Sequence, residues 1–197
     1  EITGDYPAWE YKRDSALREE LTADMSKLPD DLLLAFLSGT EVVQTDDGFT
    51  FDNPGELSSD ELFRLFLWWT NRSVLEKYRN PDDGWFYFPS SAIHRTLDCY
   101  FRRYSFDITQ CAGYDTKSGT VVDQTAALEP GNLRLQRVSK TMDRHEVTYV
   151  VDFYPVLDDL QVGPEPFARK EYTLLCYPGD FYIESARYVP LDGAAAQ

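Results

Sequence analysis

The histidines and cysteines are the residues of this 197-residue chain with the greatest potential for catalysis. A Ser-His-Asp or Cys-His site would have to use His94 or His145, because the chain has only two histidines. His94 and Cys99 are five residues apart, a spacing that does not align two side chains on one helical face. The chain also lacks the G-x-S-x-G, P-loop and H-E-x-x-H motifs. We therefore predict no catalytic residue and no cofactor.

Two acidic stretches and three cysteines are the residues that could hold a metal ion. Asp46-Asp47-Gly48 and Asn80-Pro81-Asp82-Asp83-Gly84 lack the ligand positions of a calcium-binding EF-hand loop, so we interpret both as solvated turns. Cys99, Cys111 and Cys176 show no C-x-x-C spacing, which excludes a zinc knuckle. Cys99 and Cys176 lie within apolar patterns, which favours buried free thiols; one disulfide with one free thiol is the alternative. We predict no metal site.

Aromatic residues make up 15% of the chain, and two runs of them could form a platform on which a sugar or peptide stacks. Trp68-Trp69 falls inside the most apolar helical pattern, where core packing is the better explanation. Trp85 and Tyr87 share one face of a short strand beside a turn, so a platform competes more closely with core packing there. We take Trp85, Tyr87 and His94 as the candidate binding residues.

The elements that would position these residues are helices followed by strands. Ser58 with Glu61 forms a capping-box pattern before an apolar helix that runs to about Thr70, and the helix after Pro89 carries His94. Short strands are predicted at 85–88, 106–110 and 120–122. From 132 to 190, period-two patterning predicts four strands, the last two joined through Tyr177-Pro178-Gly179-Asp180.

This order of elements is typical of the α+β class. We predict N-terminal helices packed on a curved, mainly antiparallel β-sheet formed by the C-terminal half, similar to cystatin or nuclear-transport-factor folds. The expected organisation is a single domain over 1–190, followed by a disordered tail at 191–197. Within the domain we expect a helical part with a small hairpin at 1–57, helices and short strands at 58–131, and an antiparallel meander at 132–190.

The net charge of −15 limits the partners of this protein. A nucleic-acid binder needs a positive surface to displace counterions, and anionic membrane surfaces should repel the chain. We therefore predict no nucleic-acid partner. The acidic residues keep the protein soluble, or alternatively they form a surface that binds a basic partner. No run approaches the ~20 apolar residues of a transmembrane span. Because the chain starts at Glu1, a processed leader or a trimmed sequence is expected.

Three stretches together resemble a known group of domains. They are D-G-W-F-Y-F-P-S-S at 83–91, A-G-Y-D-T-K-S-G at 112–119 and G-D-F-Y-I-E-S at 179–185. Their order is similar to uncharacterised domains of secreted proteins and lipoproteins of Gram-positive gut bacteria, over about residues 80–190. The resemblance implies an α+β domain in an extracytoplasmic location, with a possible lipid anchor through a missing leader, and it carries no catalytic residue.

The function expected from these observations is non-enzymatic binding of a small ligand or a protein partner at the cell envelope. One alternative is an acidic cytoplasmic immunity-type inhibitor that engages a basic toxin through its charge. The other alternative is an enzyme with a pocket between sheet and helix, using His94 and an aspartate.

Overall fold

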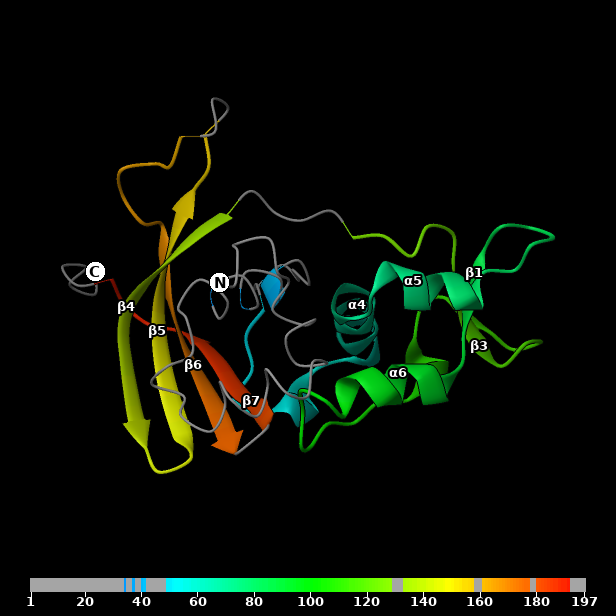
Figure 1. Ribbon diagram of the computed structural model, residues 1–197, viewed down its shortest axis with the longest axis horizontal. Coiled ribbons are helices and arrows are strands. Elements are labelled where there is room, and N and C mark those ends of the chain that lie inside the picture. Colours follow the sequence, from blue (N-terminus) through cyan, green and yellow to red (C-terminus); the bar gives the residue numbers. More distant parts are fainter. Residues whose placement is uncertain are drawn as a thin grey trace. The chain divides into compact units, whose positions relative to one another are not determined.

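The computed structural model describes residues 34, 37, 40, 41, 49–128, 133–157, 161–177 and 180–191. Contacts divide the chain into two compact units. We call Asn53–Glu129 the helical unit, and Glu1–Asp52 with Pro130–Gln197 the meander unit. Each unit contains an antiparallel sheet (Figure 1), which confirms the predicted α+β class. That the chain acts as one domain over 1–190 stays a prediction, and the expected tail lies almost entirely outside the described residues.

The elements follow one another in a simple order. The helical unit contains η3 (Pro54–Glu56), α4 (Ser59–Trp69), α5 (Arg72–Leu75), η4 (Glu76–Tyr78), β1 (Phe86–Phe88), α6 (Ser90–Leu97), η5 (Ile108–Gln110), β2 (Tyr114–Asp115) and β3 (Thr120–Asp123). The described part of the meander unit contains β4 (Leu133–Asp143), β5 (Glu146–Pro155), β6 (Ala168–Tyr177) and β7 (Asp180–Tyr188).

Helix α4 begins at the predicted capping box. The backbone N–H of Glu61 donates to the Ser58 hydroxyl at 3.3 Å, and the Glu61 carboxylate accepts from the Ser58 backbone N–H at 2.8 Å. These bonds satisfy two donors that a helix start leaves without partners. The helix buries its apolar side chains and packs against α6 and η5 of the helical unit. Its predicted place against the C-terminal sheet stays a prediction.

The aromatic core of the helical unit sets the orientation of β1. The Phe88 ring lies 5.1 Å from the ring of Phe66 on α4 and 5.6 Å from that of Tyr78. Phe86 is fully buried as well. Since side chains alternate along a strand, burial of these two phenylalanines turns Tyr87, which lies between them, to the opposite face.

The small sheet has the strand order β1-β3-β2, and both pairings are antiparallel. Tyr87 lies opposite Val122, and Asp115 lies opposite Thr120. The strand predicted at 106–110 is wrong. The Asp107 carboxylate accepts from the Thr109 backbone N–H at 3.0 Å and starts the 3-10 turn η5 instead, because a short acidic side chain competes for backbone donors.

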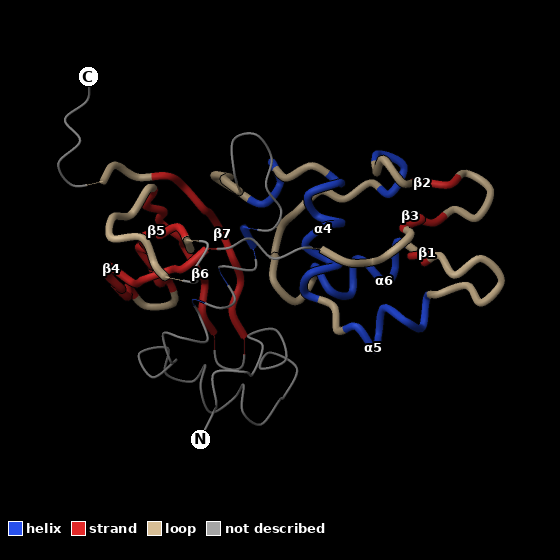
Figure 2. Tube along the Cα trace, turned by 90° about the horizontal axis from the view of Figure 1, so that it is seen from above, coloured by secondary structure: helices blue, strands red, loops and turns tan. Residues whose placement is uncertain are grey.

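The predicted C-terminal meander is confirmed as a four-stranded sheet of order β4-β5-β6-β7, drawn in red in Figure 2. Residues of β5 that share its inner face are buried: Val147, Tyr149, Val151 and Phe153. Tyr177 of β6 lies opposite Asp180 of β7, which leaves a two-residue connection and confirms the last hairpin. Pro178 and Gly179 of that turn lie outside the described residues.

A buried ion pair fastens the segment around Glu41 to the meander. The Lys170 ammonium on β6 lies 2.9 and 2.7 Å from the two Glu41 carboxylate oxygens and donates to the Phe49 carbonyl at 2.8 Å. The Tyr172 hydroxyl donates to the same carboxylate at 2.6 Å. Lys170 is 0% exposed and Glu41 is 4% exposed.

This pair balances two opposing effects. Desolvation raises the pKa of Glu41 and lowers the pKa of Lys170, because burial disfavours both charged forms. Their mutual attraction and hydrogen bonds oppose both shifts. Removal of one partner therefore leaves a buried charge with no counter-charge, which is far more costly than removal of both.

We predict that Lys170→Met lowers the free energy of unfolding of the meander unit by about 3–5 kcal/mol at pH 7. Without the ammonium, burial raises the pKa of the Glu41 carboxyl further. At low pH the carboxyl is protonated and neutral, so its burial costs little. As the pH rises through the raised pKa, the carboxyl ionises and the folded state becomes less stable. The loss relative to wild type should be smaller at pH 4 than at pH 7. Hydrogen exchange of β6 amides measures it.

The double variant Glu41→Gln/Lys170→Met is the control for this prediction. It removes both charges, so its stability should exceed that of Lys170→Met at pH 7. Equal stability of Lys170→Met and wild type, or no recovery in the double variant, would contradict a structural ion pair.

Candidate functional site

Trp85 is positioned by the tight turn that precedes β1. The backbone N–H of Asn80 donates to the Trp85 carbonyl at 2.8 Å, and that of Gly84 donates to the Asn80 carbonyl at 2.8 Å. Next to the turn, Arg79 pairs with Phe86 as an antiparallel bridge. Gly84 has φ +78°, a left-handed conformation that glycine adopts without steric cost. The predicted solvated turn at 80–84 is thus a closed loop with a defined hydrogen-bond pattern.

Asp83 holds both candidate aromatic residues. Its carboxylate accepts from the Trp85 backbone N–H at 2.9 Å and from the Tyr87 hydroxyl at 2.7 Å. The pKa of Asp83 is lowered by these bonds, that from Trp85 first and that from Tyr87 second. Trp85 is 42% exposed, whereas Phe86 and Phe88 are fully buried. Core packing therefore does not explain Trp85, and the structure places it at the surface with its backbone fixed.

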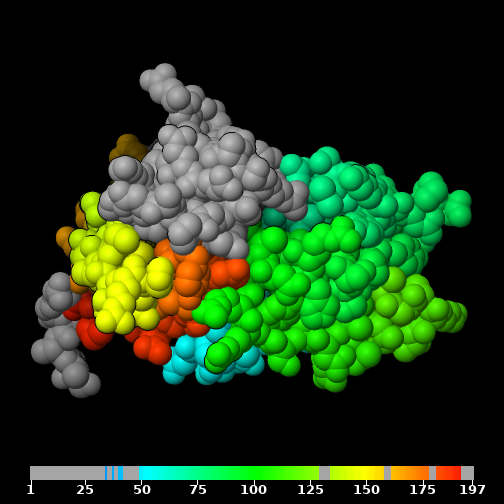
Figure 3. Space-filling model, turned by 60° about the horizontal axis from the view of Figure 1, so that its bottom comes forward, coloured from blue at the N-terminus to red at the C-terminus, as the bar shows by residue number. Residues whose placement is uncertain are grey.

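Neighbouring strands extend this surface. By strand alternation, Val122, Thr120 and Asp115 lie on the same side of the small sheet as Tyr87. We call the surface formed by Asp83, Trp85, Tyr87, Asp115, Thr120 and Val122 the aromatic face. Figure 3 shows the turns at 80–84 (teal) and 115–119 (yellow-green) projecting from the same end of the helical unit.

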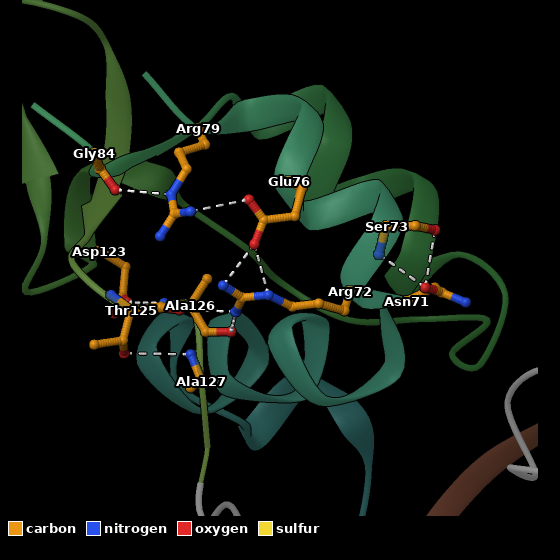
Figure 4. A network of polar contacts seen from close by, with 10 residues as sticks. All are labelled: Asn71, Arg72, Ser73, Glu76, Arg79, Gly84, Asp123, Thr125, Ala126 and Ala127. Carbon is orange, nitrogen blue, oxygen red and sulfur yellow. Dashed lines mark hydrogen bonds and ion pairs between the residues drawn. The ribbon is translucent and has the colours of Figure 1, made fainter. Parts of the chain in front are cut away.

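The buried side of β1 is braced by two arginines. The guanidinium groups of Arg72 and Arg79 each lie 5.0 Å from the centre of the Phe86 ring. Glu76 binds both, at 2.7 Å from Arg72 and 3.4 Å from Arg79 (Figure 4). Arg79 also donates to the Gly84 carbonyl at 3.1 Å, which links this brace to the turn below Trp85.

Arg72 also holds the chain beyond β3. Its guanidinium donates to the carbonyls of Thr125 and Ala126 at 2.8 and 3.1 Å (Figure 4). Ala126 has φ +46°, which is unfavourable for a residue with a Cβ. Asp123 accepts from the Ala126 backbone N–H at 2.6 Å and fixes the same bend. Arg72, Glu76 and Arg79 were missed from the sequence, where only their helical spacing connects them.

His94 belongs to a different cluster from Trp85 and Tyr87. Its Nδ1 lies 2.6 Å from the Tyr104 hydroxyl, and that hydroxyl donates to Asp98 at 2.8 Å. Because the hydroxyl has one proton, Nδ1 is the donor in the bond to Tyr104. The Phe106 ring packs edge-on against the imidazole at 5.4 Å. Desolvation and the Asp98 bond raise the pKa of Tyr104. These described contacts give His94 a structural role.

A polar pocket of about 490 Å³ lies at the start of α4. Gly55, Leu57, Ser58, Ser59, Asp60, Ser105, Asp107 and Gln110 line it. Asp60 accepts from the Ala112 backbone N–H at 2.9 Å, and the Asp107 backbone N–H donates to the Ser59 hydroxyl at 3.0 Å. None of the three predicted binding residues lines the pocket. The two hydrogen bonds connect the start of α4 to the segment at 107–112.

The three cysteines are free thiols. Cys176 is buried as predicted, but the prediction that Cys99 is buried is wrong; Cys111, which no apolar pattern marked, is buried as well. Cys99 follows the end of α6, where the helical pattern no longer decides which side faces the core. Desolvation, with the charges of Asp60 and Asp107, raises the pKa of Cys111 to about 12.

In the part of the chain that the structure describes, no group of three or more His, Cys, Asp or Glu residues could hold a metal ion. No helix there is long and apolar enough to cross a membrane.

Comparison with known proteins gave no match: no family model, no curated protein and no solved structure is significantly similar to this chain.

We predict that Gly84→Ala lowers the free energy of unfolding of the helical unit by about 1–2 kcal/mol, because a Cβ resists positive φ. No atom lies within 4 Å of the position that this Cβ would take, so the cost is conformational rather than steric. Gly84→Asn should cost less, since asparagine tolerates this conformation better. Urea unfolding followed by tryptophan fluorescence measures both. An unchanged midpoint for Gly84→Ala would contradict the turn.

We predict that one thiol of the native protein reacts rapidly with dithiodipyridine at pH 8, and that Cys99→Ser abolishes this phase. Cys111 should react only on unfolding, because it is buried and its raised pKa keeps it protonated. Two rapid thiols in the native state would contradict the described burial.

Proposed function

We propose that this protein is a non-enzymatic extracytoplasmic domain that binds a ligand or protein partner at the cell envelope through its aromatic face. One observation carries the proposal: Trp85 presents an exposed indole from a turn that Asn80, Asp83 and Gly84 hold in place. A large side chain with a fixed backbone loses little conformational entropy on binding, and tryptophan is enriched among the residues that dominate binding energy.

The composition of the aromatic face supports recognition rather than catalysis. Its carboxylates at Asp83 and Asp115 are acceptors for backbone and hydroxyl donors that build the two turns. His94, the histidine of the alternative enzyme hypothesis, is bonded to Tyr104, which is not part of this surface. The aromatic rings thus supply contact area, and the polar groups at the rim supply orientation.

The extracytoplasmic location rests on the resemblance of residues 80–190 to domains of secreted proteins and lipoproteins. Fractionation of cells that produce the protein, followed by detection in the envelope or culture fraction, tests the location separately from binding. Recovery in the cytoplasm alone would reject it.

A second candidate function is an acidic cytoplasmic inhibitor of a basic toxin. The observation that favours it is the charge distribution, with 13 acidic and four basic residues within 1–52. Such an inhibitor would bind a basic protein with strong salt dependence, and binding would be insensitive to changes at Trp85.

We predict that Trp85→Ala weakens binding of the purified chain to isolated cell envelopes by at least about tenfold, the effect of losing a dominant aromatic contact. Phe167→Ala is the matched control, because Phe167 is also exposed, at 56%, but belongs to the meander unit. Co-sedimentation over a range of protein concentrations measures both affinities. Equal affinity of Trp85→Ala and wild type would reject the aromatic face as the binding site.

A further inference from the structure

The aromatic face carries negative charge that the described structure does not neutralise. Asp83 accepts only from neutral donors, namely the Trp85 N–H, the Tyr87 hydroxyl and the Asn80 side-chain amide at 3.2 Å. Asp115 accepts from the Ser118 backbone N–H at 3.0 Å and the Ser118 hydroxyl at 2.7 Å. Hydrogen bonds from neutral donors leave the full charge on a carboxylate.

Both carboxylates act on the same aromatic ring. The bond to Asp83 is the largest cause that raises the pKa of Tyr87, and the charge of Asp115 is the smallest. Lys117 has only the smallest of the effects that lower the pKa of Asp115. In the described residues, neither aspartate forms an ion pair. Both aspartates are ionised at neutral pH, because hydrogen bonds lower their pKa values.

On the opposite side of β1, an aromatic ring next to a carboxylate binds two cationic side chains. There, one ring and one carboxylate, Phe86 and Glu76, are occupied by the guanidinium groups of Arg72 and Arg79. Cations bind over aromatic faces because the ring quadrupole is negative there, and adjacent carboxylates strengthen the attraction. The aromatic face offers the same kinds of group on the solvent side.

We propose that the aromatic face binds a cationic side chain, lysine, on a partner protein. This inference rests on the proposed function and adds the chemical class of what is recognised. Trp85 and Tyr87 contact the ammonium and its alkyl chain, and Asp83 and Asp115 supply the opposite charge. An exposed cation–π contact contributes only about 0.5–1 kcal/mol, so a free small amine would bind weakly. A lysine carried on a protein adds the surrounding contacts that a stable complex needs.

The test uses the full chain labelled with ¹⁵N and follows the Trp85 indole N–H by NMR. The probe is an acetylated Gly-Gly-Lys-Gly-Gly amide peptide, and the matched probe contains Nε-acetyl-lysine, which has the same alkyl chain without the charge. The lysine peptide should shift the Trp85 signal in a saturable manner, and added salt should weaken its binding. The acetylated lysine should shift it much less.

Two charge variants connect the effect to the aspartates. Asp115→Asn and Asp83→Asn retain an oxygen acceptor for the turns and should each weaken lysine-peptide binding roughly two- to fivefold. Asp107→Asn is the matched control, because Asp107 is also an exposed carboxylate that accepts from a nearby backbone N–H. It should bind as wild type does. If Asp83→Asn shifts the Trp85 signal before any peptide is added, the binding measured for Asp115→Asn alone decides whether the aspartates take part in lysine recognition.

The outcomes separate this inference from the proposed function. An equal response to both peptides, or equal weakening by Asp107→Asn and Asp115→Asn, overturns lysine recognition and leaves envelope binding intact. Failure of the lysine peptide to shift the Trp85 signal also overturns it, provided that envelope binding remains sensitive to Trp85→Ala. Envelope binding that is insensitive to Trp85→Ala rejects the proposed function itself.

Discussion

Burial of Phe86 and Phe88 is the constraint on which the aromatic face depends. Both rings belong to the core of the helical unit, and Phe88 contacts Phe66 of α4. Because side chains alternate along β1, Tyr87 must then lie on the other side of the sheet, and Asp83 links it to Trp85 through bonds to the Tyr87 hydroxyl and the Trp85 backbone N–H. The core contacts thereby hold Tyr87 of the aromatic face in place, although the two phenylalanines are not part of that face.

The two units use buried or bridged charge in different ways. In the meander unit, the ion pair of Lys170 and Glu41 joins segments far apart in the sequence, and its role is structural. In the helical unit, Arg72, Glu76 and Arg79 brace the buried side of β1 and remain partly exposed. The aromatic face has carboxylates that the turns orient and that no described ion pair neutralises, and this charge is the basis of the proposed lysine recognition.

Prediction from the sequence succeeded where local interactions decide. The capping box at Ser58 and Glu61 and the period-two pattern of β5 act over a few residues, so α4 and the meander were found. It failed at 106–110, where a side-chain cap replaced a strand, and at Cys99, whose exposure depends on how the chain leaves α6. The partners of His94 were not predicted either: Tyr104 and Phe106 contact the imidazole, and its part in binding with Trp85 and Tyr87 stays a prediction.

Sequence patterns alone were enough to predict the α+β class, the antiparallel meander and an aromatic strand beside an acidic turn. Those features follow from periodicity and turn chemistry, which operate between near neighbours. Three outcomes appear only in the folded chain: Trp85 is exposed, Asp83 and Asp115 both act on Tyr87, and Lys170 pairs with Glu41. These outcomes depend on contacts between distant segments, and a pattern of residue types does not specify which face of a strand or which charged side chain the core will enclose.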